Sequence, residues 1–158
     1  MAETMFLRLP AALLLGALLG WAARRHVGAP TRALFGVAAL VLASCVMPFW
    51  MLPVLMDRAE AEPLLRLARD ASLAAAGAAT VLCFATWAPV LRHLWMLEQI
   101  GMLVRFAVWY GMAPGALCTA WDADAQPAVG LGLLAAALAL GLLWALRGWR
   151  AGMSRCAP

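Results

Sequence analysis

The stretch AVGLGLLAAALALGLLWAL, from Ala128 to Leu146, contains neither a charged residue nor a proline. In a helix that rises about 1.5 Å per residue, a run of this length crosses roughly 30 Å of hydrocarbon. Four other largely apolar stretches lie at residues 5–23, 33–56, 71–91 and 103–121. The chain is 66% hydrophobic and only 13% charged, whereas a soluble domain carries about 25% charged residues. The sequence therefore predicts a single domain over residues 1–158, an all-α integral membrane bundle of about five transmembrane helices.

The charged segment between the second and third stretches has an amphipathic pattern. Leu64, Leu65 and Leu67 alternate with the charged residues of positions 60–70. Pro63 suits the first turn of a helix. This pattern predicts a short helix that lies on the membrane surface and does not cross the bilayer.

Prolines and glycines mark where the predicted spans bend and pack. Pro48 and Pro53 in the second span, and Pro114 in the fourth, each remove a backbone hydrogen bond and bend a helix. Broken backbone inside a membrane must face protein or a water-filled cavity, so we expect these prolines to lie at helix–helix contacts. Gly16 and Gly20 form a small-xxx-small pattern, which allows two helix backbones to approach closely.

The arginines are divided unevenly between the two sides of the predicted membrane. If the chain starts outside and crosses five times, eight arginines lie on one side and four on the other. An excess of basic residues in short loops marks the cytoplasmic side. We therefore expect a multi-pass protein of the bacterial inner membrane, with a periplasmic N-terminus and a cytoplasmic C-terminus. The N-terminal stretch also has the apolar character of an export signal, but the arginine pair that follows it favours an uncleaved span. The eight arginines on the expected cytoplasmic side are Arg24, Arg25, Arg32, Arg92, Arg105, Arg147, Arg150 and Arg155. The four on the opposite side are Arg8, Arg58, Arg66 and Arg69.

Arg105 is a strongly ionic residue inside a predicted span. A charge within a membrane segment is a candidate for a functional role. Glu98 lies seven positions earlier, on the same helical face, and can pair with it. The alternative is structural, because Arg105 lies near the inner end of the predicted span, where a long side chain can reach the interface.

The methionine, cysteine and histidine residues suggest two candidate cofactor sites, and the first is a copper site. Met47 and Met51 share a helix face, and Met112 and Cys118 lie in the outer half of the fourth span. Thioether and thiol donors select Cu(I), so this set predicts a possible copper site near the periplasmic face. The alternative is that these methionines fill gaps in a proline-bent interface.

A haem b site is the second candidate. His26 and His93 fall on the same predicted side, at the inner ends of the first and third spans. Two histidines at one depth can serve as axial ligands of a haem, with nearby arginines pairing its propionates. Both lie at or beyond helix ends, however, and the alternative is polar contact at the cytoplasmic face.

Several classes of function do not fit the sequence. It contains no HExxH motif, no phosphate-binding glycine loop and no recognisable Ser/His/Asp set, so we do not expect an enzyme. The predicted spans contain no acidic residue, which argues against an ion-coupled transporter. Because the arginines form small clusters at helix ends, the net charge of +4 indicates contact with the lipid bilayer and its anionic head groups, not with nucleic acid.

Three runs of sequence carry a resemblance to a known family. They are MPFWMLPVLMDRA at 47–59, SLAAAGAATVLCFATWAPVL at 72–91 and MAPGALCTAW at 112–121. In these runs, about a third of the chain, the sequence resembles the CtaG-type membrane assembly factors of bacterial haem-copper oxidases. The resemblance implies a role in copper delivery. That family has His and Met in a membrane helix before a proline pair, whereas this chain has Cys45 and Met47 there.

These observations lead to an expected function and two alternatives. We expect a non-catalytic integral membrane subunit or assembly factor of a bacterial respiratory or oxidase-type complex, which binds a larger membrane protein assembly. The first alternative is a membrane copper-handling protein with a Met/Cys site. The second is a small transporter or channel, for which five spans would be an awkward number to divide into inverted repeats.

Overall fold

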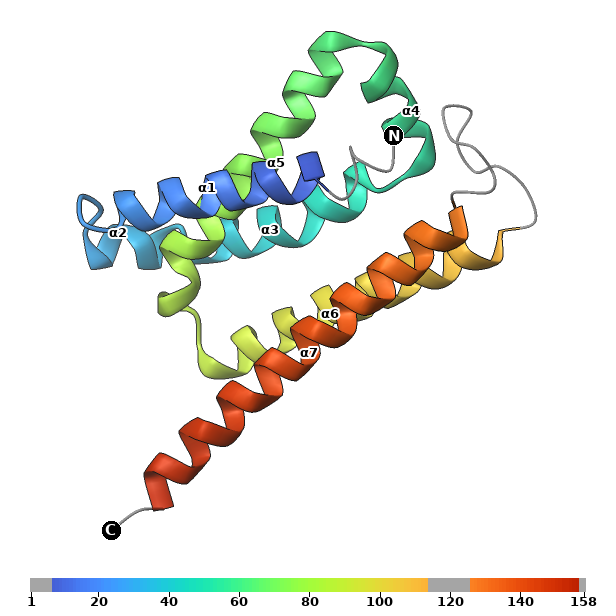
Figure 1. The fold of residues 1–158 in the computed structure, drawn as a ribbon. Helices are drawn as coiled ribbons and strands as arrows, with labels where there is room; N and C mark the ends of the chain where they lie inside the picture. Colours follow the sequence, from blue (N-terminus) through green and yellow to red (C-terminus); the bar gives the residue numbers. More distant parts are fainter. Residues whose placement is uncertain (1–6, 114–125, 157–158) are drawn as a thin grey trace.

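The computed structural model describes residues 7–113 and 126–156, and residues 149–156 only as backbone (Figure 1). Over these ranges the chain is all-α, with seven α-helices, one 3-10 turn and no strand. The predicted all-α class is confirmed. The elements are α1 Leu9–Ala23, α2 Ala29–Leu34, α3 Gly36–Trp50, α4 Pro53–Ala61, α5 Pro63–Cys83, η2 Phe84–Thr86, α6 Pro89–Met112 and α7 Gln126–Cys156.

Prolines set many of the helix starts. A proline occupies one of the first two positions of α1, α2, α4, α5 and α6. Its fixed φ suits the first turn of a helix, where its missing N–H would have no partner in any case. These prolines therefore suit the first turns of the helices that contain them.

Two described segments are long and apolar enough to cross a membrane. They are Pro63–Thr86 and Gln126–Gly148. The bent pair α3 and α4 makes a third if its two halves form one span, while α1 is apolar but shorter, with 15 residues. The described residues are thus all-α and contain two to three candidate transmembrane helices, fewer than the five spans that the sequence predicts.

The second predicted span, 33–56, is not one straight helix. It divides into α3 and α4, whose axes meet at 78°. Pro48 is accommodated inside α3, but the helix ends at Trp50 and a new one begins at Pro53. The residue before a proline favours an extended conformation. Leu52, which precedes Pro53, has ψ at 129°, and this extended residue separates α3 from α4.

Two further predicted boundaries are wrong. The short surface helix expected around residues 60–70 is not a separate element, because residues 63–70 form the first turns of the 21-residue helix α5. The fourth predicted span, 103–121, begins too late, because α6 already starts at Pro89 and ends at Met112. Residues 92–102, which the sequence suggested as a connection, are helical.

The helices pack in two groups that meet side by side. Helix α5 contacts α1, α3 and α4, whereas α6 packs mainly along α7 (Figure 1). The predicted close approach at Gly16 and Gly20 is confirmed, because a Cβ on Gly20 would lie 2.5 Å from the carbonyl oxygen of Ala78 and one on Gly16 would collide with Ala74. Gly77 of α5 makes the reciprocal approach to Leu13. Only residues without a side chain fit such backbone contacts.

Helices α6 and α7 form an antiparallel hairpin whose register is fixed by close contacts. A Cβ on Gly130 would lie 2.8 Å from the carbonyl oxygen of Ala107. At the other end, the rings of His93 and Trp144 lie 5.3 Å apart. This register places Ala137, at the middle of the candidate span of α7, beside the turn of α6 that contains Met102.

Candidate functional site

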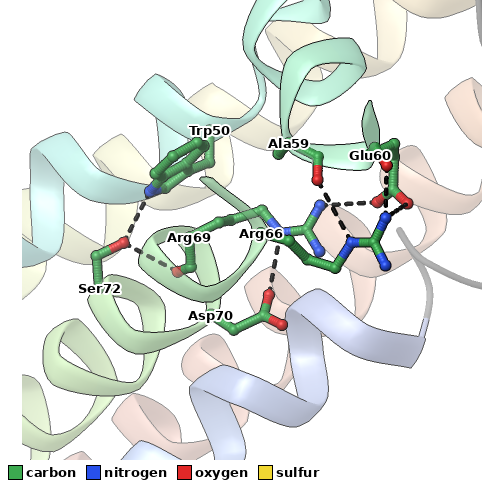
Figure 2. Close-up of polar contacts among 7 residues, drawn as sticks. All are labelled: Trp50, Ala59, Glu60, Arg66, Arg69, Asp70 and Ser72. Carbon is green, nitrogen blue, oxygen red and sulfur yellow. Dashed lines mark hydrogen bonds and ion pairs between the residues drawn. The ribbon is translucent and has the colours of Figure 1, made fainter. Parts of the chain in front are cut away.

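A fully buried arginine lies at the point where α4 turns into α5. The Arg69 side chain has no exposed surface. Its Nη1 donates a hydrogen bond to Glu60 Oε1 at 2.9 Å, and its Nε donates to Asp70 Oδ1 at 3.0 Å (Figure 2). A buried cation is costly unless it is paired, so the two carboxylates hold the guanidinium inside the protein.

The amphipathic pattern of α5 places Arg69 on its buried side. Leu73 and Ala76 follow at four and seven positions, and both are buried. Residues at these spacings share one face of a helix. Glu60 reaches the same face from the last turn of α4, across the bend at Glu62. The cluster therefore joins α4 to α5.

Arg66 completes this cluster. It donates hydrogen bonds to the backbone oxygens of Ala59 and Glu60, the last carbonyls of α4, and its guanidinium lies 3.8 Å from the Glu60 carboxylate (Figure 2). A basic side chain stabilises the partly negative C-terminal end of a helix. Two arginines and two carboxylates thus form a nearly neutral group, which we call the Arg69 cluster: Glu60, Arg66, Arg69 and Asp70.

Hydrogen bonds from two aromatic residues hold the break between α3 and α4. Trp50 Nε1 donates to Ser72 Oγ at 2.7 Å, and Ser72 Oγ donates to the carbonyl oxygen of Arg69 at 2.9 Å (Figure 2). The buried Tyr110 hydroxyl of α6 donates to the carbonyl oxygen of Met51 at 2.9 Å. The Met51 carbonyl at the break is thereby satisfied from α6, as apolar surroundings require, while the Trp50 side chain ties the end of α3 to α5.

A second ionic pair lies on the outside of α6. Arg105 Nη2 donates to Glu98 Oε1 at 2.6 Å, so the pair suggested by the sequence is formed. Unlike Arg69, both side chains are open, with 65% of Arg105 and 55% of Glu98 exposed. Each lies three or four positions from Met102, which is roughly 5 Å along the helix axis. The pair therefore flanks the middle of the α6–α7 hairpin and is not near a helix end.

A shallow groove adjoins this pair. It has a volume of about 270 Å³ and is lined by Pro48 of α3 together with Glu98, Arg105, Phe106 and other residues of α6. Helical spacing gathers several apolar residues around the charges on one face of α6. We call this surface the α6 ion-pair face. It consists of Leu91, Leu94, Glu98, Arg105, Trp109 and Met112, all of which are exposed.

The predicted copper ligands do not all lie together. Met47 and Met51 line one cavity of about 200 Å³, as their spacing suggested. Met112 is 78% exposed and lines a different cavity, between α6 and α7. Cys118 and Pro114 lie outside the described residues. Within the described ranges, no three His, Cys, Asp or Glu side chains gather closely enough to hold a metal ion.

The two histidines have separate surroundings. His26 is exposed in the turn after α1. His93 is exposed near the start of α6, where its Nδ1 lies 2.7 Å from the carbonyl oxygen of Pro89 and its ring faces Trp144. His93 therefore faces Trp144 and not His26, whereas two axial haem ligands would face one another.

Comparison with known proteins does not identify the site. No protein family, curated protein or solved structure matches this chain.

Sequence reasoning missed the Arg69 cluster and placed its residues on the membrane surface. The alternation of leucine with charged residues between positions 60 and 70 suggested a short amphipathic helix on that surface. A signal was nevertheless present, because Arg69 continues the buried stripe of Leu73 and Ala76 by one turn. A charge on an otherwise apolar stripe indicates a buried partner, here Glu60.

Proposed function

We propose that this chain is a non-catalytic integral membrane subunit or assembly factor, which binds a larger membrane protein complex through the α6 ion-pair face. The observation that supports the proposal is the exposed Glu98–Arg105 pair near mid-length of the α6–α7 hairpin, in which α7 is a candidate span. The resemblance to CtaG-type assembly factors supports a bacterial oxidase or another respiratory complex as the partner. The gathering of Arg24 and Arg147 around one cavity is consistent with a cytoplasmic arginine-rich end.

The position of the Glu98–Arg105 pair along the hairpin supports this proposal. Helix α7 contains the most apolar candidate span of the described residues, and α6 packs along it. If α7 crosses the bilayer, the register of the hairpin puts Glu98 and Arg105 close to the centre of the hydrocarbon. A charged side chain there costs about 2.5–3.5 kcal/mol on insertion, so such residues face protein or water in membrane proteins.

The described residues of the chain do not cover the pair. More than half of each side chain is exposed, while the rest of the α6 ion-pair face presents leucine, tryptophan and methionine. Apolar and aromatic surface around a small polar centre is the composition of a protein interface. The groove beside Pro48 provides a recess for a side chain of the neighbour. We therefore assign this face to a transmembrane helix of another subunit.

Site-specific photocrosslinking in native membranes tests the proposal. A photoreactive amino acid at Trp109 is expected to form a crosslink to a larger membrane polypeptide. The matched control is the same amino acid at Leu138 of α7, which is 67% exposed but has no charged residue beside it in the sequence. Equal crosslinking from both positions would mean that the face has no particular partner.

A second experiment tests the role of the charges. The variant Glu98→Leu/Arg105→Leu is expected to insert in the membrane but to lose co-purification with the partner in mild detergent, because the polar centre of the interface is gone. A native chain that migrates alone in the same detergent, or that crosslinks only to a second copy of itself, contradicts a subunit or assembly role.

A further inference from the structure

A cavity lined by two arginines lies where the two helix groups meet. Its volume is about 340 Å³, and it lies between α1, α5, α6 and α7. Arg24, at the C-terminal end of α1, and Arg147 of α7 both line it. No carboxylate is among its lining residues. The cavity is distinct from the Arg69 cluster and from the α6 ion-pair face.

The neighbouring charges do not neutralise these two arginines. Neither Arg24 nor Arg147 forms an ion pair with a described residue. Arg92 lies beside the cavity, since its Nη2 donates to the carbonyl oxygen of the lining residue Ala85 and its guanidinium lies over the ring of the lining residue Phe84, so it adds to the positive charge. Glu98 is engaged by Arg105. The cavity therefore has a net positive charge and attracts anions.

The rest of the lining is apolar and aromatic. Trp95 and Trp144 form part of the wall, and each ring lies close to the Phe84 ring, at 6.0 and 6.3 Å between centroids. Leu140 and Val81 continue the wall with aliphatic surface. Tryptophan beside arginine is typical of the head-group level of a bilayer. A ligand that fits both features has an anionic head and a hydrocarbon chain.

We propose that this cavity binds the head group of an anionic phospholipid of the surrounding leaflet. Arg24 and Arg147 attract its phosphate, and the acyl chain lies against the aromatic and aliphatic wall. Basic pockets between membrane helices recognise acidic lipids in this way. The lipid would fill the junction of the two helix groups and so stabilise their mutual position.

Lipid binding to the purified full-length chain tests this inference. Native mass spectrometry or a thermal-shift titration in mild detergent would compare phosphatidylglycerol, phosphatidylcholine and inorganic phosphate. We expect phosphatidylglycerol to bind best. For the variant Arg24→Gln/Arg147→Gln we expect roughly thirtyfold weaker binding of phosphatidylglycerol, and for each single variant roughly fivefold. Arg24→Lys/Arg147→Lys keeps the charge and should retain most of the affinity.

The control is Arg58→Gln, because Arg58 is exposed on α4 and is not among the lining residues of the cavity. The proposal is overturned if phosphatidylcholine binds as well as phosphatidylglycerol, or if the glutamine variants bind like the native chain. Inorganic phosphate that binds as tightly as the lipid would indicate a simple ion site instead. If the double variant does not fold, the two single variants carry the same comparison.

Discussion

The buried Arg69–Glu60 pair gives the sharpest test of how this fold is held together. Arg69→Met removes a cation whose side chain is fully buried and leaves Glu60, which is only 13% exposed, without its nearest partner. Breaking a buried pair by removing one member costs about 3–5 kcal/mol, because the remaining charge stays desolvated. Arg66 still lies 3.8 Å from Glu60, so we expect the lower end of that range, about 3 kcal/mol.

A double-mutant cycle separates the charge effect from the loss of packing. In Arg69→Met/Glu60→Gln no unpaired carboxylate remains at position 60, so the destabilisation should be smaller than the sum of the two single effects by about 2 kcal/mol. The exposed pair Glu98–Arg105 provides a matched control in the isolated chain. The cycle made by Glu98→Gln and Arg105→Met should show a coupling below about 1 kcal/mol, since exposed pairs are screened by solvent.

The measurement is the free energy of unfolding of the purified chain in mixed micelles, followed by circular dichroism during titration with a denaturing detergent. Secondary structure should be retained in every variant before the transition. If Arg69→Met is as stable as the native chain, or if both cycles give the same coupling, Arg69 does not clamp α4 to α5 and the reasoning from its burial is refuted.

Two further substitutions test the helix contacts. Gly16→Ala should destabilise the chain by about 1–3 kcal/mol, since the new methyl group would collide with the backbone of Ala74. The control is Gly148→Ala, whose methyl group has no neighbour within 4 Å. It should be neutral or slightly stabilising in the same unfolding assay. Tyr110→Phe should cost about 1–2 kcal/mol because the carbonyl of Met51 loses a buried donor, and a variant as stable as the native chain would show that this hydrogen bond does not secure the helix break.

Local sterics made part of the fold predictable. Gly16 and Gly20 are four positions apart, and any helix that packs there must approach closely, whatever its identity. The Glu98–Arg105 pair was predictable for a similar reason, since seven positions make two helical turns. Both features depend only on the geometry of one helix and on the chemistry of its own residues.

The helix breaks were less predictable because hydropathy averages over them. Pro48 and Pro53 lie five positions apart in one apolar run, yet the first is inside α3 and the second begins α4. The difference depends on partners from distant parts of the chain, namely Ser72 for Trp50 and Tyr110 for Met51. Such contacts join residues 22 and 59 positions apart, which no window of sequence can represent.

The position of Arg105 along its helix was difficult to predict for the same reason. Hydropathy placed the start of its helix at residue 103 and therefore placed the charge near an interface. The structure starts α6 at Pro89, and the contacts with α7 shift Arg105 toward the middle of the hairpin. This position of Arg105 is one of the observations on which the proposed interface with another subunit rests.

The chain therefore contains two ionic groups in apolar surroundings, and they differ in how they are covered. In the Arg69 cluster the Arg69–Glu60 pair is covered by the protein, and the charges of the cluster nearly cancel. The Glu98–Arg105 pair also cancels in charge, but both side chains remain open on the outside of α6. A bilayer does not solvate an open ion pair at its centre. If α7 crosses the bilayer, the second pair therefore needs a cover that the described residues do not supply, and this need is the physical basis for proposing that the chain works as part of a larger assembly.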